Sequence, residues 1–396
     1  MVGVEVYSWL YIENHYKPNH KAHCTKICGN TGSGKRFVGA VHSRFTLCVI
    51  VWRFKFVKDI PLLRIVYTAI LFVVLAAHCK ASDINALLEA TKQNINQYYV
   101  LSESIPNITT SLDNTELQHA LANATSEQEI GNILTAHLEG FDKHFTVQPI
   151  PTANTKEKAT FPKEPWFTKL DRKNAGLRHV EIKQGNIGYI EFWGFANLNN
   201  NTQQKFNNVM QLLSDVDGLI IDLRENGGGS GEMVSWLISY FVKGRVHTNS
   251  FYTRYTDVSN DFYTEKNIDG GKLESVPLYI LVGQNTFSAA EEFAYNLKHM
   301  GRATIIGEPS KGGANPWRWF PLTDNMRIGI PATRAINPIT QTNWEGKGVI
   351  PNVEVNEQDA LEKAYEISLK TVLENTESAY QKQDIENALS ELRLDK

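Results

Sequence analysis

Short apolar runs alternate with helical segments along the second half of the chain. The apolar runs lie at residues 187–192, 219–223, 278–282 and 303–306. Continuous apolar strands joined by amphipathic helices predict a sheet that is covered by helices on both faces. We therefore expect an α/β body over residues 179–356.

The part of the chain before this body follows a helical pattern. Between residues 82 and 148, apolar side chains recur three and four positions apart, as they do at Ile130, Ile133 and Leu134. This spacing predicts a small helical bundle domain. Residues 149–178 are rich in Pro, Lys and Thr and are predicted to form a linker. Residues 357–396 are predicted to form an amphipathic C-terminal helix on the surface of the body.

Residues 1–81 contain the pattern of a secretory signal peptide. A basic flank at 53–64 precedes the 13-residue apolar run IVYTAILFVVLAA at 65–77. The run is too short to span a bilayer comfortably and ends in small residues, so we expect cleavage between Ala76 and Ala81. This predicts an exported protein, periplasmic or extracellular, with no stable membrane span after cleavage; an uncleaved anchor is the alternative. Residues 1–50 are hypothesised to reflect a start site assigned too early.

The composition restricts the classes of function. With 42% hydrophobic and 21% charged residues and a formal net charge of −3, the chain lacks the basic excess typical of nucleic-acid binding. All four cysteines precede residue 80, so the body needs no disulfide. The glycine-rich stretch 29–35 lacks both the preceding strand and the following Ser or Thr of a phosphate-binding loop. We expect no cofactor and no metal.

Ser288 is the candidate nucleophile. It begins an apolar helix five residues after the strand 278–282, where free backbone N–H groups stabilise a developing oxyanion. The same serine also fits a structural role, because Ser288-Ala-Ala-Glu291 is a capping box. The local sequence leaves both interpretations open.

A run of glycines, Gly227-Gly228-Gly229, follows the strand 219–223. Glycines often form a tight turn after a strand, but three in a row also allow the backbone N–H groups to approach a substrate carbonyl closely. A serine nucleophile further needs a base. His144 lies in a loop at the end of the helical bundle, and Lys311, which lies beside two glycines, is the rival.

Several motifs in this order resemble the tail-specific (C-terminal processing) serine peptidases, in particular the branch of the tricorn protease core and the interphotoreceptor retinoid-binding protein modules. The resemblance covers roughly residues 85–360 and rests on four stretches: Asp222-Leu-Arg-Glu-Asn-Gly-Gly-Gly229, Thr286-Phe-Ser-Ala-Ala-Glu-Glu292, Gly307-Glu-Pro-Ser-Lys-Gly-Gly313 and Asn343-Trp-Glu-Gly-Lys-Gly-Val-Ile-Pro-Asn352.

The resemblance implies a ββα-spiral body, akin to the crotonase and Clp-type peptidase folds, with a small helical N-terminal domain. It implies Ser288 as nucleophile, His144 as base and Glu345 as the supporting acid. The implied oxyanion hole consists of the N–H groups of Gly228 or Gly227 and of Ala289. The expected activity is hydrolysis of unfolded or extended polypeptides through an acyl-enzyme.

This chain departs from the family pattern in three places. The lysine base of the processing peptidases is replaced by Gly313, and Lys143 stands where the tricorn core has a serine. The interval between His144 and Ile187 is too short for the PDZ domain of the processing peptidases. Two alternatives stay open: a peptidase that uses Lys311 as base, and a non-catalytic carrier of lipophilic ligands on the same fold.

Overall fold

The computed structural model describes residues 83–151 and 164–394. The predicted extension and signal peptide, the glycine-rich stretch 29–35 and all four cysteines lie outside these residues. Within the described ranges, no helix has both the length and the apolar character that a bilayer crossing requires.

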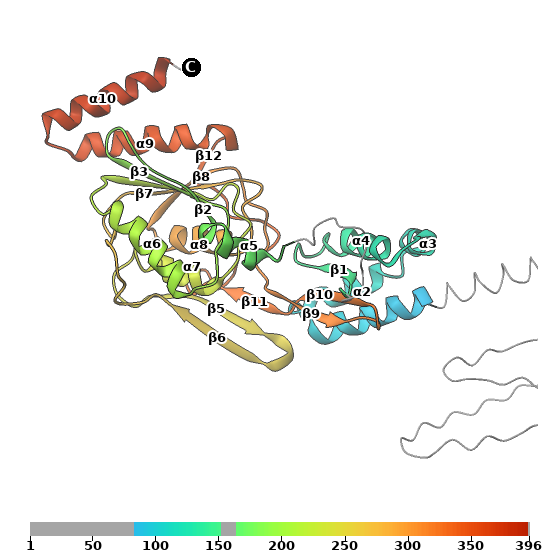
Figure 1. Ribbon diagram of the computed structural model, residues 1–396. Helices are drawn as coiled ribbons and strands as arrows, with labels where there is room; N and C mark the ends of the chain where they lie inside the picture. Colours follow the sequence, from blue (N-terminus) through green and yellow to red (C-terminus); the bar gives the residue numbers. More distant parts are fainter. Residues whose placement is uncertain (1–82, 152–163, 395–396) are drawn as a thin grey trace, which may run out of the picture. The chain divides into compact units, whose positions relative to one another are not determined.

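A six-stranded sheet forms the centre of the body (Figure 1). Its outermost strand β2 pairs antiparallel with β3, and every other neighbouring pair is parallel. The spatial order is β12 (Val353–Glu354), β8 (Ala303–Gly307), β7 (Leu278–Val282), β4 (Gly218–Asp222), β3 (Ile187–Phe192) and β2 (Leu177–Lys183). The four apolar runs of the sequence thus become β3, β4, β7 and β8.

Helices cover both faces of this sheet, as the continuous apolar strands predict. Successive residues of a strand point to opposite faces, so Leu219 and Ile221 join one core cluster and Ile220 the other. The first cluster includes side chains from α6 (Asn200–Leu212), α7 (Gly231–Ile238) and α8 (Ala289–His299). The second includes side chains from α9 (Ala360–Asn375) and α10 (Ala379–Leu394). The predicted α/β class is confirmed.

The N-terminal part is helical, as predicted. Residues 83–98 are helical, and η1 (Ser102–Ser104), α2 (Ile105–Ser111), α3 (Thr115–Asn123) and α4 (Glu127–Leu138) follow. Its apolar core also takes in Met326, Ile328 and Ile330, from a strand almost two hundred positions further along the sequence. The helices therefore pack on strands that belong to the second half of the chain.

Two small antiparallel sheets complete the architecture. One contains β1 (Thr146–Pro149), β10 (Met326–Pro331) and β9 (Trp317–Pro321), and the other contains β11 (Thr333–Ile336), β5 (His247–Thr253) and β6 (Val258–Tyr263). A 3-10 turn, η3 (Arg254–Thr256), joins β5 to β6. The strand β1 directly follows the loop of His144 and pairs with β10. This pairing holds the loop next to the second half of the chain.

Two segments differ from the prediction. The C-terminal region is two helices, not one: after η4 (Glu357–Asp359), α9 ends where Thr376 adopts an extended conformation, and Ser378 N–H donates to Thr376 Oγ1 at 3.2 Å. Such side-chain-to-backbone bonds compete with the helix. The described end of the predicted linker contains a short helix, α5 (Trp166–Arg172), and η2 (Asn174–Gly176).

Candidate active site

Ser288 occupies the N-cap of α8, directly after the loop that leaves β7. Its φ is 55°, a left-handed value that is uncommon for a residue with a side chain. Its N–H donates to Glu291 Oε2 at 2.8 Å, which forms the predicted capping box. Capping alone does not require a strained backbone, and strain of this kind concentrates at functional sites. Ser288 therefore combines the structural role with the geometry expected of a nucleophile.

Glu291 connects the candidate nucleophile Ser288 to a second loop. Its fully buried carboxylate also accepts hydrogen bonds from Ser310 Oγ at 2.6 Å, Gly312 N–H at 2.6 Å and Gly313 N–H at 3.0 Å. Burial raises the pKa of Glu291 and outweighs the opposing effect of these hydrogen bonds. The sequence identifies Glu291 only as a capping residue, whereas the structure shows that it fixes residues 310–313 beside Ser288.

The glycine run 227–229 closely approaches the candidate nucleophile Ser288. Gly228 has a φ of +86°, and a Cβ at this position would lie 2.9 Å from both Ser288 Cβ and Ala289 N. Only glycine fits here, because the site is both left-handed and sterically closed. The run thus lies against the start of α8, where the sequence predicts the oxyanion hole.

The three predicted oxyanion donors differ in their present partners. Gly227 N–H donates to the Trp193 carbonyl at 3.2 Å, and Gly228 N–H donates to Asn226 Oδ1 at 2.9 Å. Within the described part of the chain, Ala289 N–H donates no hydrogen bond. Of the two glycines, Gly228 is the one in contact with Ser288.

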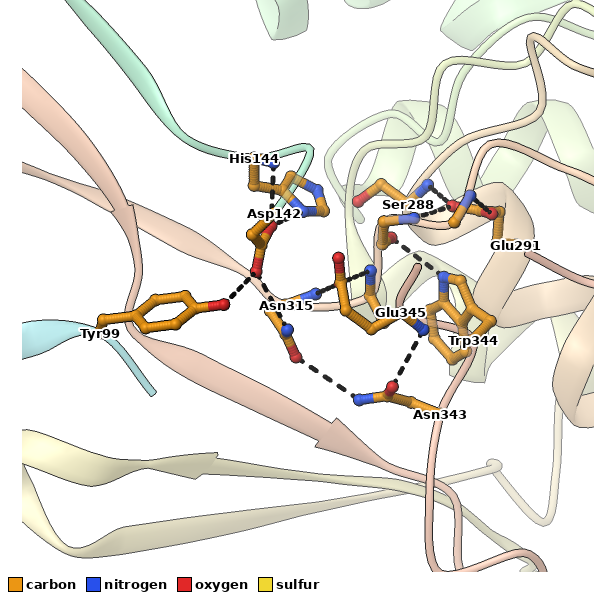
Figure 2. Close-up of polar contacts among 12 residues, drawn as sticks. Tyr99, Asp142, His144, Ser288, Glu291, Asn315, Asn343, Trp344 and Glu345 are labelled. Atoms are coloured by element: carbon orange, nitrogen blue, oxygen red, sulfur yellow. Dashed lines mark hydrogen bonds and ion pairs between the residues drawn. The ribbon is translucent and has the colours of Figure 1, made fainter. Parts of the chain in front are cut away.

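His144 is 6% exposed and lies in the loop between α4 and β1. Its ring packs on Phe287, with ring centroids 4.6 Å apart. Its buried Nδ1 has no hydrogen-bond partner and lies 3.7 Å from Asp142 Oδ1. Figure 2 shows the imidazole with one edge toward Asp142 and the other toward Ser288. No hydrogen bond joins His144 to Ser288, as is common in proteases without substrate.

Gly313 explains how the histidine ring fits. A Cβ at this position would lie 2.1 Å from Phe287 Cε2 and 2.9 Å from His144 Cε1. Any side chain at residue 313 would therefore displace the rings of Phe287 and His144. This is the position at which the family resemblance places the lysine of the processing peptidases.

Lys311, the rival base, has a different environment. Its side chain is exposed, and its ammonium lies 4.7 Å from the centre of the Phe287 ring. A lysine that acts as a base is generally shielded from water. The exposed position of Lys311 favours His144 over Lys311.

Glu345 supports a loop and makes no hydrogen bond to His144. Its Oε2 accepts from Ala314 N–H at 2.6 Å and from Asn315 N–H at 3.2 Å. Burial and the neighbouring charge of Asp142 raise the pKa of Glu345 to about 8. Both effects favour the protonated form of Glu345.

Asp142 lies at the candidate site, although no role was assigned to it from the sequence. It is 1% exposed, and its Oδ2 accepts from the Tyr99 hydroxyl at 3.4 Å and from Asn315 Nδ2 at 3.2 Å. Burial and the charge of Asp142 in turn raise the pKa of Tyr99. The sequence does contain one indication of Asp142, namely an acidic residue two positions before the candidate base His144.

Asp142, His144 and Glu345 form a cluster of side chains of the types that also bind divalent metals. Their potential ligand atoms lie within 4.8 Å of one another.

The comparisons with known proteins concern the family and the fold of the chain. Residues 186–355 match peptidase family S41, which confirms the predicted resemblance to the C-terminal processing peptidases at the level of the family. The chain is 24% identical over 182 residues to a carboxy-terminal processing protease of Bacillus subtilis, covering 45% of this chain and 36% of the relative. It is 31% identical over 177 residues to the chloroplastic carboxyl-terminal-processing peptidase 2 of Arabidopsis thaliana, covering 42% and 31%. The match therefore spans about a third of the length of these relatives.

A solved structure described as a peptidase of Parabacteroides merdae has the same fold. The TM-score is 0.53 at 18% sequence identity, and the alignment covers 75% of this chain and 98% of that protein. The similarity includes most of the described residues and so extends beyond the segment that matches the family.

Proposed function

We propose that this chain, whose residues 186–355 match peptidase family S41, is a serine peptidase that hydrolyses unfolded or extended polypeptides through an acyl-enzyme. The observation that carries the proposal is the position of Gly313, where the absence of a side chain admits the His144 ring next to Phe287 and the start of α8. The relatives, which are named as processing proteases, give independent support.

In the proposed mechanism, Ser288 Oγ attacks the substrate carbonyl while His144 takes the hydroxyl proton. The C–N bond then breaks, and His144 returns the proton to the leaving amine. A water molecule, deprotonated by the same imidazole, hydrolyses the ester and regenerates Ser288. The strained backbone of Ser288 and its Glu291 contact hold the hydroxyl at the start of α8.

The oxyanion is assigned to the N–H groups of Gly228 and Ala289. Ala289 is the first residue of α8, where the helix dipole favours negative charge. Gly228 N–H donates to Asn226 Oδ1 in this structure, so the oxyanion replaces or shares that acceptor when substrate binds. Gly227 is the less suitable donor because its N–H is bound to a main-chain carbonyl.

Export remains part of the proposal. The apolar run 65–77 and its basic flank support a signal peptide, and one relative is named as chloroplastic, which is compatible with delivery across a membrane. Sequencing the N-terminus of the protein from its native source tests this point: a mature start within residues 76–81 supports export, and one before residue 50 contradicts it.

Casein hydrolysis by the full chain tests the proposed activity, beside Ser288→Ala and His144→Ala. We expect activity in the parent and a loss of at least about 10³-fold in both variants, because nucleophile and base act as a unit. Loss in Ser288→Ala alone would exclude His144 as base. A folded parent without activity on casein or on a pool of unstructured peptides would contradict the proposal and favour a ligand carrier.

A further inference from the structure

Two carboxyl groups lie near His144, the buried Asp142 and the half-buried Glu345, and only Asp142 is placed to orient the ring. Asp142 belongs to the same loop as His144, and its Oδ1 accepts the His144 backbone N–H at 3.0 Å. The same oxygen lies 3.7 Å from His144 Nδ1, which is buried without a hydrogen-bond partner. A movement of less than about 1 Å closes this gap to hydrogen-bond length.

We propose that Asp142, and not Glu345, is the acid that orients His144; the inference rests on the proposed peptidase function. With Nδ1–H directed at Asp142, the lone pair of Nε2 faces the Ser288 side of the ring. When Ser288 Oγ bonds to the substrate carbon, its proton passes to Nε2. The resulting imidazolium is stabilised by the Asp142 carboxylate, which itself takes no proton.

The surroundings of Asp142 suit a fixed, charged carboxylate. Its Oδ2 accepts from the Tyr99 hydroxyl and from Asn315 Nδ2, and its Oδ1 accepts from the main chain of its own loop. These donors satisfy the hydrogen-bonding capacity of the Asp142 carboxylate. Among the described residues, no lysine or arginine forms an ion pair with Asp142 within 4 Å. Asp142 is thereby held at one orientation, as the acid of a triad must be.

Glu345 acts one step further from the reaction. Among the described residues, both hydrogen bonds of the Glu345 side chain go to the main chain of residues 314–315, and Asn315 in turn donates its side-chain amide N–H to Asp142. Asn343 extends the series, since its Nδ2 reaches Asn315 Oδ1 at 3.4 Å and its Oδ1 accepts the Glu345 N–H at 3.0 Å (Figure 2). Glu345 is therefore a positioning residue that acts through Asn315 and Asp142.

The proposal is tested with Asp142→Asn and Glu345→Gln, two neutral variants of neighbouring carboxylates. Hydrolysis of fluorescent casein gives the rates, and thermal unfolding verifies that each variant folds. Asp142→Asn is expected to lower kcat by about 10²- to 10⁴-fold and to move the acid limb of the pH profile to lower pH. Glu345→Gln is expected to lower kcat by about tenfold or less, since its contacts are to the main chain. An equal or greater loss in Glu345→Gln would overturn the proposal.

A second measurement needs no turnover. Nitrogen-15 NMR of Ser288→Ala, with His144 assigned by comparison with the double variant Ser288→Ala/His144→Ala, reports which ring nitrogen carries the proton. We expect a protonated Nδ1 at neutral pH, and a shift toward protonated Nε2 when Asp142→Asn is added. A protonated Nε2 in the Ser288→Ala protein would overturn the assignment even if Asp142→Asn failed to fold. Because this test is independent of casein, failure of Asp142 as the orienting acid and failure of the peptidase activity are distinguishable.

Discussion

Gly313 and His144 compete for the same space: a Cβ on Gly313 would lie 2.9 Å from His144 Cε1. The family resemblance places a lysine base at this position, so the glycine removes one base and makes room for another. Both residues stand out in the sequence, but as separate features. Their contact indicates that the glycine is the condition for placing the histidine.

Gly313→Ala should therefore impair catalysis. The backbone of Gly313 is not in the left-handed region, so the substitution acts through the contacts with Phe287 and His144 and not through backbone strain. Displacement of a base by about 1 Å costs on the order of 10²-fold in rate. We expect kcat on casein to fall by about that factor. Unchanged kcat in Gly313→Ala would show that the His144 position is not critical.

Gly228→Ala should abolish activity by displacing the start of α8. The new Cβ would meet Phe287 O at 2.6 Å and Ser288 Cβ at 2.9 Å. Gly244→Ala is the matched control, because Gly244 also has a positive φ of +79° but has no atom within 4 Å of the added carbon. Both variants bear the backbone strain, and only Gly228→Ala should lose casein hydrolysis. Similar activity in the two variants would contradict the proposed role of Gly228.

Lys311→Ala should retain casein hydrolysis. The exposed Lys311 ammonium contacts the face of Phe287, a contact worth about 0.5–1 kcal/mol at an exposed site. Its loss should lower the stability slightly and leave kcat/KM within about threefold of the parent. A loss comparable to that of Ser288→Ala would instead identify Lys311 as the base.

Glu292 should make the stability of the protein depend on pH. Burial raises the pKa of this carboxyl in α8 from its ordinary value of 4.5 to about 8. The native state therefore holds the proton more tightly than the unfolded chain, and the free energy of unfolding falls as pH rises from about 4.5 to about 8. Each unit of this shift corresponds to about 1.4 kcal/mol.

Glu292→Gln, compared in a Ser288→Ala background to prevent self-digestion, should remove this dependence. We expect little difference in urea unfolding at pH 4.5, and at pH 8 a variant more stable than its parent by a few kcal/mol. The amide can keep the hydrogen bond that Glu292 Oε1 accepts from Asn249. A variant less stable than its parent at pH 8 would mean that Glu292 is ionised and stabilising in the native state.

The pattern of apolar residues was sufficient to predict the inner strands of the central sheet, but it was not sufficient to predict the small sheets beside it. The run 278–282 coincides with β7 because a strand buried on both faces must be apolar throughout. The strands β5 and β6 escaped prediction because their side chains are mostly polar or only partly buried, as at His247 and Ser259. A pattern of hydrophobicity cannot reveal strands that lack an apolar face.

The residues of the candidate site were likewise predictable from the sequence only in part. Ser288 and the glycine run were predicted because each lies at the end of an apolar strand, within a local motif. Asp142 was missed because its partners Tyr99 and Asn315 are far away in the sequence and meet it only in the folded chain. Glu345 was predicted by resemblance as the acid that supports the base, with a direct contact to His144 left open, and its hydrogen bonds go to the main chain of residues 314–315.

The most direct test of the central claim is covalent labelling of the full chain with a fluorophosphonate, followed by peptide mapping. The account predicts one phosphonylated residue, Ser288, with no label in Ser288→Ala and labelling slowed by at least about 10²-fold in His144→Ala. Labelling at another residue, or an unchanged rate in His144→Ala, would contradict the proposed pairing of Ser288 with His144.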